Sequence, residues 1–140
     1  MAGSLTNIGE ELALNLLLRN SGTQPTDIFI GLATNSPSSN PLGEDSVLAD
    51  VDEVDDLGYA KQEVVFSAPV KIENDISAVE NNSQIEFGPW EEDEDIGVNY
   101  AFLVDNNDNL IGIFELPSVK EPVSGESLII VENNCTFGLN

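Results

Sequence analysis

Two apolar runs separated by a short polar segment form the clearest hydrophobic pattern in the chain. Residues 98–104 and 110–116 are rich in β-branched and aromatic side chains, and residues 105–109 between them are all Asp or Asn. Apolar runs of this length on either side of a five-residue polar segment are typical of a β-hairpin. The pattern therefore predicts a hairpin around which the other strands pack.

A second pattern repeats at helical spacing near the N-terminus. Apolar residues recur every three or four positions, at Leu5, Ile8, Leu12 and Leu16. This spacing predicts a helix within residues 4–21, capped by Thr6 or Ser4 and ended near Gly22. Three further leucines make the apolar face wider than one side of a helix needs. The helix therefore either lies deep under a sheet, which we expect, or also packs on a neighbouring subunit.

The rest of the chain contains short strand-like segments separated by turn residues. They cover residues 27–34, 59–66, 70–76, 84–87, 127–131 and 135–139. With the hairpin, they give seven or eight short strands at the spacing typical of a sandwich. We expect a mainly β fold: an antiparallel β-sandwich of jelly-roll type with one N-terminal helix. Residues 1–140 then form a single domain, with the sandwich in residues 27–139 and the one cysteine, Cys135, as a buried apolar residue.

Residues 35–57 form a long segment with few strand signals. The segment carries two prolines and seven carboxylates, and it is long for an inert loop in a compact domain. Four apolar residues recur along it, at Val47, Leu48, Val51 and Val54. They indicate either one helical turn or a set of contacts that fix the loop. The segment is then either a solvated excursion or an insertion that contacts a partner or an ion.

Charge and composition exclude several classes of function. The chain has 26 acidic and 4 basic residues, a net charge of −22, and no histidine. Phosphate backbones and anionic membrane surfaces repel such a chain, and no run of 18 apolar residues is present, so we expect neither a nucleic-acid nor a membrane partner. Without histidine the commonest general base and metal ligand are missing. We therefore expect no catalytic residues, no bound cofactor and no enzymatic activity.

Runs of carboxylates supply the candidate metal ligands. Glu91, Asp93 and Asp95 lie in one run and Asp52 and Asp55 in another, and calcium prefers such oxygen ligands. The loop of the predicted hairpin begins like an EF-hand loop but lacks its glycine and terminal glutamate, so we interpret it as an Asx-rich turn. A calcium-dependent carbohydrate-binding module is therefore one alternative function.

Several local sequences follow one another in a recognisable order. They are the N-terminal helix, residues 28–34, Gly58-Tyr59-Ala60, residues 85–87, the hairpin and residues 124–126. This order resembles a family of small virion proteins of tailed phages, often called tail fibre proteins. The resemblance implies a non-enzymatic structural protein on the particle surface. Two loops depart from the family pattern, residues 35–57 and residues 88–95. Because loops usually make the contacts with partners, the binding partner of the family is not assigned directly to this chain.

Within this resemblance, we expect a capsid decoration (cement) protein that binds and stabilises the assembled head. A single small domain without repeats suits a clamp on a shell better than a shaft, and a clamp stabilises by binding the assembled state. A tail, tail-fibre or baseplate component is the alternative. The expected partners are the major capsid protein or another virion protein, and copies of the chain itself, in our guess a trimer. Candidate contact residues are Leu12 and Leu16 on the helix, with the aromatic Tyr59 and Trp90, although a core role is more typical of Trp90.

Overall fold

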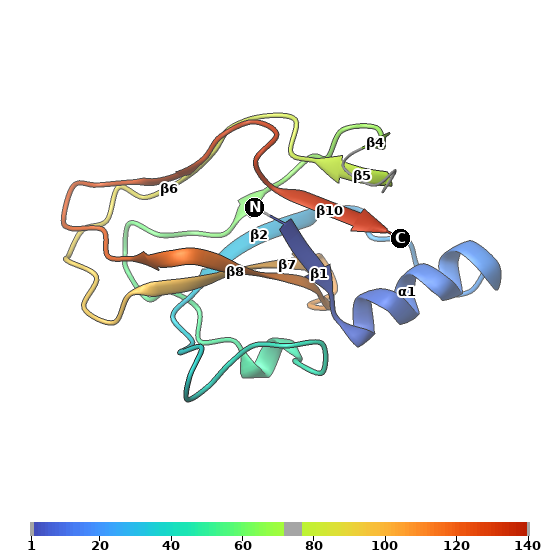
Figure 1. Cartoon of the computed structure of the whole chain (residues 1–140), viewed down its shortest axis with the longest axis horizontal. Helices are drawn as coiled ribbons and strands as arrows, with labels where there is room; N and C mark the ends of the chain where they lie inside the picture. Colours follow the sequence, from blue (N-terminus) through green and yellow to red (C-terminus); the bar gives the residue numbers. More distant parts are fainter. Residues whose placement is uncertain (1, 72–76, 140) are drawn as a thin grey trace.

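The structure, a computed structural model, describes residues 2–71 and 77–139, which form two β-layers with one helix at the side (Figure 1). The described residues form ten strands: β1 Ala2–Leu5, β2 Ile28–Ala33, β3 Gln62–Glu63, β4 Val70–Lys71, β5 Ser77–Glu80, β6 Ile85–Phe87, β7 Val98–Asp105, β8 Leu110–Lys120, β9 Leu128–Ile130 and β10 Thr136–Leu139. The helix α1 spans Asn7–Leu18, and a short 3-10 helix, η1, spans Leu48–Asp50. The prediction of a mainly β fold with one N-terminal helix is confirmed.

Eight of the strands form one sheet in the order β3-β2-β7-β8-β1-β10-β5-β4, and β6 and β9 form a separate pair. The large sheet curls, so that β10, β5 and β4 lie above β2, β7 and β8 in Figure 1, with β6 and β9 beside them. Each pair of strands is antiparallel except β1 and β10, which are parallel. The two layers of the expected sandwich therefore belong largely to one curled sheet.

Strand β1 replaces the start of the predicted helix. Ser4 and Leu5 pair with β8, and Ala2 and Gly3 pair with β10, so β1 joins the two layers. The prediction of a helix from Ser4 was wrong at this end, because the sheet satisfies the backbone groups of these residues and α1 begins only at Asn7. The predicted cap at Thr6 is confirmed, since its side chain accepts a hydrogen bond from the Gly9 N–H at 3.1 Å.

The main core lies between the two layers. It contains the following buried residues: Ile30, Leu32, Val54, Val64, Ile85, Phe87, Trp90, Val98, Ala101, Leu103, Phe114, Ile130 and Cys135. Cys135 is fully buried, as expected, and burial raises the pKa of its thiol to about 12. The thiol is therefore protonated at neutral pH and acts as an apolar packing group.

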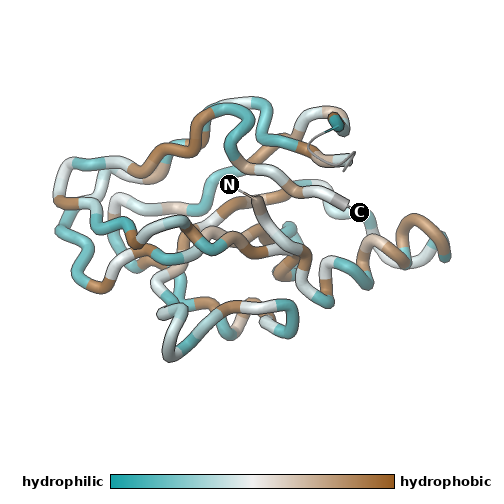
Figure 2. Tube along the Cα trace, viewed as in Figure 1, coloured by the Kyte–Doolittle hydropathy of each residue, from teal (hydrophilic) through white to brown (hydrophobic). Residues whose placement is uncertain are grey.

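A second core lies on the opposite face of β2, β7 and β8, where residues 35–57 run along the sheet (Figure 1). We call this segment the acidic cover. Its Leu42, Leu48 and Val51 pack against a set of sheet residues: Ala33, Tyr100, Phe102, Val104, Leu110 and Ile113. Figure 2 shows apolar and polar positions interspersed along the cover. The predicted helical turn is present as η1, and β7 is buried on both of its faces.

Two predicted strands are shorter in the structure. The strand expected at residues 59–66 is reduced to β3, which pairs with β2 over Gln62 and Glu63 only. The chain then leaves this layer for the other, where Phe66 forms an isolated bridge with Asn81. Of the strand expected at residues 70–76, the structure contains β4, while residues 72–76 lie outside the described residues.

Candidate interaction surface

The first turn of α1 is held tightly on the sheet. The Thr6 hydroxyl donates to the Leu110 carbonyl at 2.5 Å, and the Thr6 N–H donates to the Ile111 carbonyl at 2.9 Å. A side chain at Gly9 would meet the Ile111 carbonyl oxygen, so this close approach requires glycine. The base of α1 is therefore fixed to β8 by hydrogen bonds and by direct backbone contact.

The rest of α1 extends away from the β-layers (Figure 1). Gly9 is its one fully buried residue, and Leu12 and Leu16 are half-buried on the side that faces the body. Leu14, Leu17 and Leu18 are 55%, 81% and 73% exposed. The expectation that the helix lies deep under a sheet was wrong, because the acidic cover and the second layer already occupy the two faces of the sheet.

The exposed leucines form a stripe along the outer side of α1. Residues three and four positions apart lie on one helix face, so Leu14, Leu17 and Leu18 share this side. Sequence reasoning named Leu12 and Leu16 as contact residues and missed these three. The available signal was the excess width of the apolar face, which left packing on a neighbouring subunit as the second alternative.

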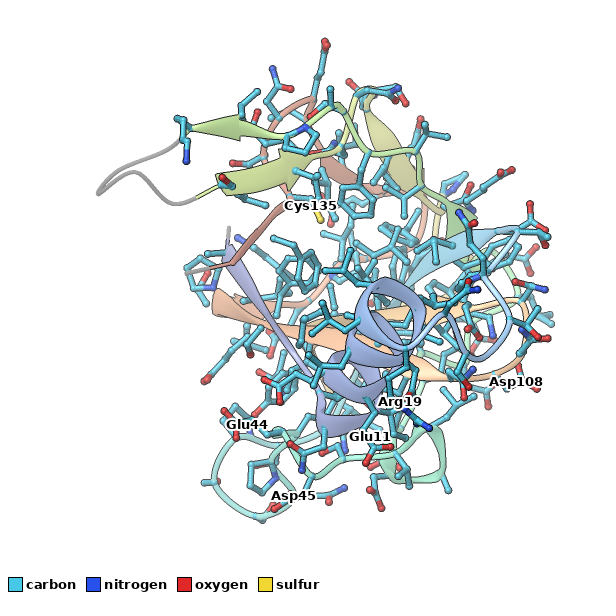
Figure 3. The ribbon with its side chains drawn as sticks, turned by 90° about the vertical axis from the view of Figure 1, so that its right-hand side faces the viewer. Glu11, Arg19, Glu44, Asp45, Asp108 and Cys135 are labelled. Carbon is cyan, nitrogen blue, oxygen red and sulfur yellow. The ribbon has the colours of Figure 1, made fainter. Side chains whose placement is uncertain are left out.

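A polar stripe lies beside the leucines. Glu11, Asn15 and Arg19 are spaced four residues apart, and the Arg19 Nη1 donates to the Asn15 Oδ1 at 2.9 Å. Figure 3, which looks onto this end of the molecule, shows the Glu11 and Arg19 side chains on the same side of α1. One flank of the helix therefore carries a negative charge in its first half and a positive charge at its end.

The two aromatic contact candidates belong to the body of the protein. Trp90 is 1% exposed and lies in the main core, which agrees with the core role that its residue type favours. Tyr59 stacks on Phe87 and contacts Trp90, with ring centroids 5.9 Å and 6.3 Å away. Its hydroxyl accepts from the Leu32 N–H at 2.9 Å and donates to Glu53 at 2.7 Å, and burial raises its pKa. Both rings therefore pack against other residues of the same chain.

The two acidic runs lie next to each other. Asp56 accepts hydrogen bonds from the N–H groups of Glu91, Glu92 and Gly58 at 2.9, 3.0 and 2.7 Å. These bonds, first the one from Glu91, lower the pKa of Asp56 below its ordinary value. Gly58 is needed in this turn, since a side chain there would meet the Pro89 carbonyl oxygen. Asp56 therefore joins the end of the acidic cover to the segment before β7.

The five calcium candidates are exposed and do not converge. Asp52 accepts a hydrogen bond from the Asn40 side chain, and Asp93 accepts one from the Ser124 N–H, each at 2.9 Å. Glu91, Asp95 and Asp55 belong to the same two runs. Within the described ranges, no three Asp, Glu or Cys side chains form a group with the geometry of a metal site. Asp52 and Asp93 thus act as hydrogen-bond acceptors for neighbouring loops.

The loop of the hairpin has the Asx-turn structure that its sequence indicates. Asp105 is buried, and its Oδ1 accepts hydrogen bonds from the N–H groups of Asn107 and Asn109 at 2.8 and 2.9 Å. Its Oδ2 accepts from the Asn109 side chain at 3.0 Å. The carboxylate therefore closes the turn between β7 and β8.

Two buried asparagines organise loops, and sequence reasoning missed both. Asn35 donates to the Asp50 carbonyl at 2.9 Å and accepts from the Asp52 N–H at 2.8 Å, which holds the acidic cover in place. Asn81 donates to the Val131 carbonyl at 3.0 Å and accepts from the Cys135 N–H at 2.8 Å. These four partners are 15 to 54 residues away in the chain, so local sequence carries no signal for these contacts.

Comparison with known families identifies the protein class. A family model described as "Podophage GP4 fiber I protein gp80" matches residues 4–137. The chain belongs to this gp80 family. The match extends from β1 to β10, and it confirms the resemblance to small structural proteins of the phage virion. No curated protein matches this gp80-family chain.

In the part of the chain that the structure describes, no helix has the length and hydropathy needed to cross a membrane.

Proposed function

We propose that this gp80-family chain is a component of a phage tail fibre that acts by binding other virion proteins and not by catalysis. The observation that carries this proposal is the match of residues 4–137 to a family whose description names a fibre protein. The matched residues include both β-layers, α1 and the acidic cover, so the proposal applies to the described fold as a unit.

The surface of the chain suits a role in assembly. The base of α1 is fixed on β8, while its outer leucines are exposed, as is typical of a helix that packs on another protein. The carboxylates of the acidic cover point to solvent, since Glu44, Asp45, Asp50, Asp52, Glu53 and Asp55 are all exposed. An apolar protrusion next to a strongly charged surface supports binding at one defined place on the particle surface.

A capsid decoration protein is the second candidate, with the major capsid protein as its partner. The observation that favours it is the two-layer body, since the sequence has no repeats and the described residues contain no long fibrous segment. A body of this kind is suited to a clamp on a shell. The trimer expected from the sequence stays a prediction under either candidate.

Copy number and labelling separate the two candidates. Quantitative mass spectrometry of purified particles should find a small number of copies per particle if the chain belongs to a fibre, and hundreds if it covers the shell. Gold-labelled antibody against the chain should then appear at tails in electron micrographs. Hundreds of copies with label on the shells would overturn the fibre proposal and support the decoration protein.

A further inference from the structure

We propose that a pocket beside the loop of the β7–β8 hairpin binds one neutral sugar ring. We call it the hairpin pocket, and it has a volume of about 480 Å³, within the range of sites for small ligands. The lining residues that bear on its chemistry are Asp27, Phe29, Lys61, Val104, Asn106 and Asp108. The site belongs to the isolated chain, so failure of its test would leave the proposed role in assembly untouched.

Strand register brings residues from three segments to one face of the sheet. Phe29 of β2 pairs with Val104 of β7 on one side and with Glu63 of β3 on the other. Asp27 and Lys61 lie two positions before Phe29 and Glu63, so the alternation of side chains directs them to the same face. The floor and two walls of the hairpin pocket therefore come from adjacent strands.

The acidic cover leaves this part of the face open. It pairs with β2 at Ala33, at the end of the strand away from Phe29. None of its residues lines the hairpin pocket. Figure 3 shows Asp108 on the opposite side of the view from Glu44 and Asp45 of the cover. A ligand can therefore reach the pocket from solvent without displacing the cover.

The floor of the hairpin pocket is apolar and includes an aromatic ring. Val104 is 1% exposed, and Phe29 packs beside it in the second core. The other aromatic residues of this core, Tyr100 and Phe102, are buried, whereas Phe29 is only half-buried. Phe29 is therefore the ring of this core on which a ligand can stack.

The rim of the hairpin pocket carries donors and acceptors with unused capacity. The Asn106 Oδ1 accepts a hydrogen bond from the Thr26 N–H at 3.0 Å, which orients the amide and leaves both of its N–H donors without a partner among the described residues. Asp27 accepts from the Thr26 hydroxyl with one oxygen, and the other is free. The side chains of Asp108 and Lys61 make no hydrogen bond or ion pair with the described part of the chain.

A sugar ring matches this arrangement of an apolar floor and a polar rim. It has a face of C–H groups that stacks on an aromatic ring, and hydroxyls around its edge. These hydroxyls can donate to the carboxylates of Asp27 and Asp108 and accept from the Asn106 amide and the Lys61 ammonium. The rim offers both kinds of partner, as a hydroxyl requires.

Charge disfavours ionic ligands at the same place. An anion would approach two carboxylates on a chain with a net charge of −22. A cation would be repelled by Lys61 and would find more carboxylates in residues 50–56 and 91–95. A neutral ligand with many hydroxyls meets neither obstacle, so the geometry points to a sugar.

The test is saturation-transfer difference NMR on the isolated chain, with EDTA present. The probes are the methyl glycosides of glucose, galactose, N-acetylglucosamine and rhamnose, with lysine amide and citrate as charged probes. At least one glycoside should receive saturation, with a dissociation constant of about 1 mM, because an open pocket holds a single ring. The charged probes should receive none.

Four variants place the binding in the hairpin pocket. Asp108→Gly should weaken it about fivefold, and glycine adopts the φ of 61° there without strain. Asn133→Gly is its control, since it removes a polar side chain at a φ of 65° in another turn. Lys61→Gln should also weaken binding, whereas Lys120→Gln, the same change at another exposed lysine, should not.

Replacement of the ring tests stacking. Phe29→Leu keeps an apolar side chain and should abolish transfer, and Phe66→Leu, in the main core, should leave it unchanged. Circular dichroism verifies the fold of each variant, and the two lysine variants test the site with the core intact. Absence of transfer to all four glycosides, binding that survives Lys61→Gln and Asp108→Gly, equal losses in the control variants, or binding of lysine amide alone would each overturn the proposal.

Discussion

At the scale of single residues, the acidic runs show what the sequence can and cannot reveal. Sequence reasoning grouped Asp52 and Asp55 in one run and Glu91 and Asp93 in another, and it assigned both runs to a possible cation. The structure instead joins the runs through Asp56, whose carboxylate accepts hydrogen bonds from the N–H groups of Glu91 and Glu92 in the other run. This contact spans 35 residues, and the local pattern of charges does not distinguish Asp56 from its neighbours.

Replacement of Asp56 by Asn should lower the melting temperature at neutral pH. Because the pKa of Asp56 is lowered in the folded state, its stabilising contribution is complete above its ordinary value of 3.8 and is lost as the pH falls through the lower folded value. The difference in melting temperature between wild type and Asp56→Asn should therefore shrink below about pH 3.8. Asp55→Asn removes the same charge from an exposed neighbour and is the control. An equal effect of both variants at pH 7 would contradict this role.

At the scale of elements, periodicity predicted α1 and the hairpin but not how α1 is placed. The leucines of the helix fit both burial under a sheet and contact with another chain, because both environments select the same residues. Strand β1 was missed because Leu5 continues the helical spacing, while its true partners lie in β8 and β10. The length of the strand at residues 59–66 was overestimated. Its apolar residues pack in the core between the layers, and only Gln62 and Glu63 pair with β2.

Gly9→Ala should destabilise the protein although it lies within a helix. Alanine at a helical glycine is ordinarily favourable by about 1 kcal/mol. Here its Cβ would meet the Ile111 carbonyl oxygen, so we expect a net loss of about 1–3 kcal/mol as α1 is pushed from β8. Chemical denaturation measures the change. Gly43→Ala is the control, because a Cβ at Gly43 meets no atom within 4 Å. A stabilised Gly9→Ala variant would show that α1 does not lie so close to β8.

At the scale of the whole molecule, the spacing of apolar residues and the residue types were sufficient to predict a mainly β fold with one helix. They were not sufficient to predict how the acidic cover packs, because its Leu42, Leu48 and Val51, which pack on the sheet, are separated by carboxylates and small residues and lack a regular period. The cover is fixed by long-range contacts, above all those of the buried Asn35. Its charges face solvent and contribute to the net charge of −22, so stability depends on the ionic environment.

Sodium chloride should raise the melting temperature. An increase from about 0.01 M to about 1 M shortens the screening length from about 30 Å to about 3 Å, which weakens repulsion among 26 carboxylates. We expect a rise of about 3–5 °C, which corresponds to about 1 kcal/mol for a domain of this size. Differential scanning calorimetry measures the shift.

Calcium and magnesium at equal ionic strength provide the control for this experiment. Since the described carboxylates do not form a metal group, both ions should shift the melting temperature equally. A larger shift with calcium, reversed by a chelator, would instead support the calcium-dependent module.

The position of β1 has a consequence for synthesis of the chain. Residues 2–5 are translated long before their neighbours in the sheet, which are residues 112–113 and 136–137. The ribosome must therefore release nearly all of the matched region before the two layers are joined. Closure over so many residues is entropically costly and slow. A nascent chain that ends before β10 has no partner for Ala2 and Gly3, so we expect β1 to complete its pairing only after β10 has left the ribosome.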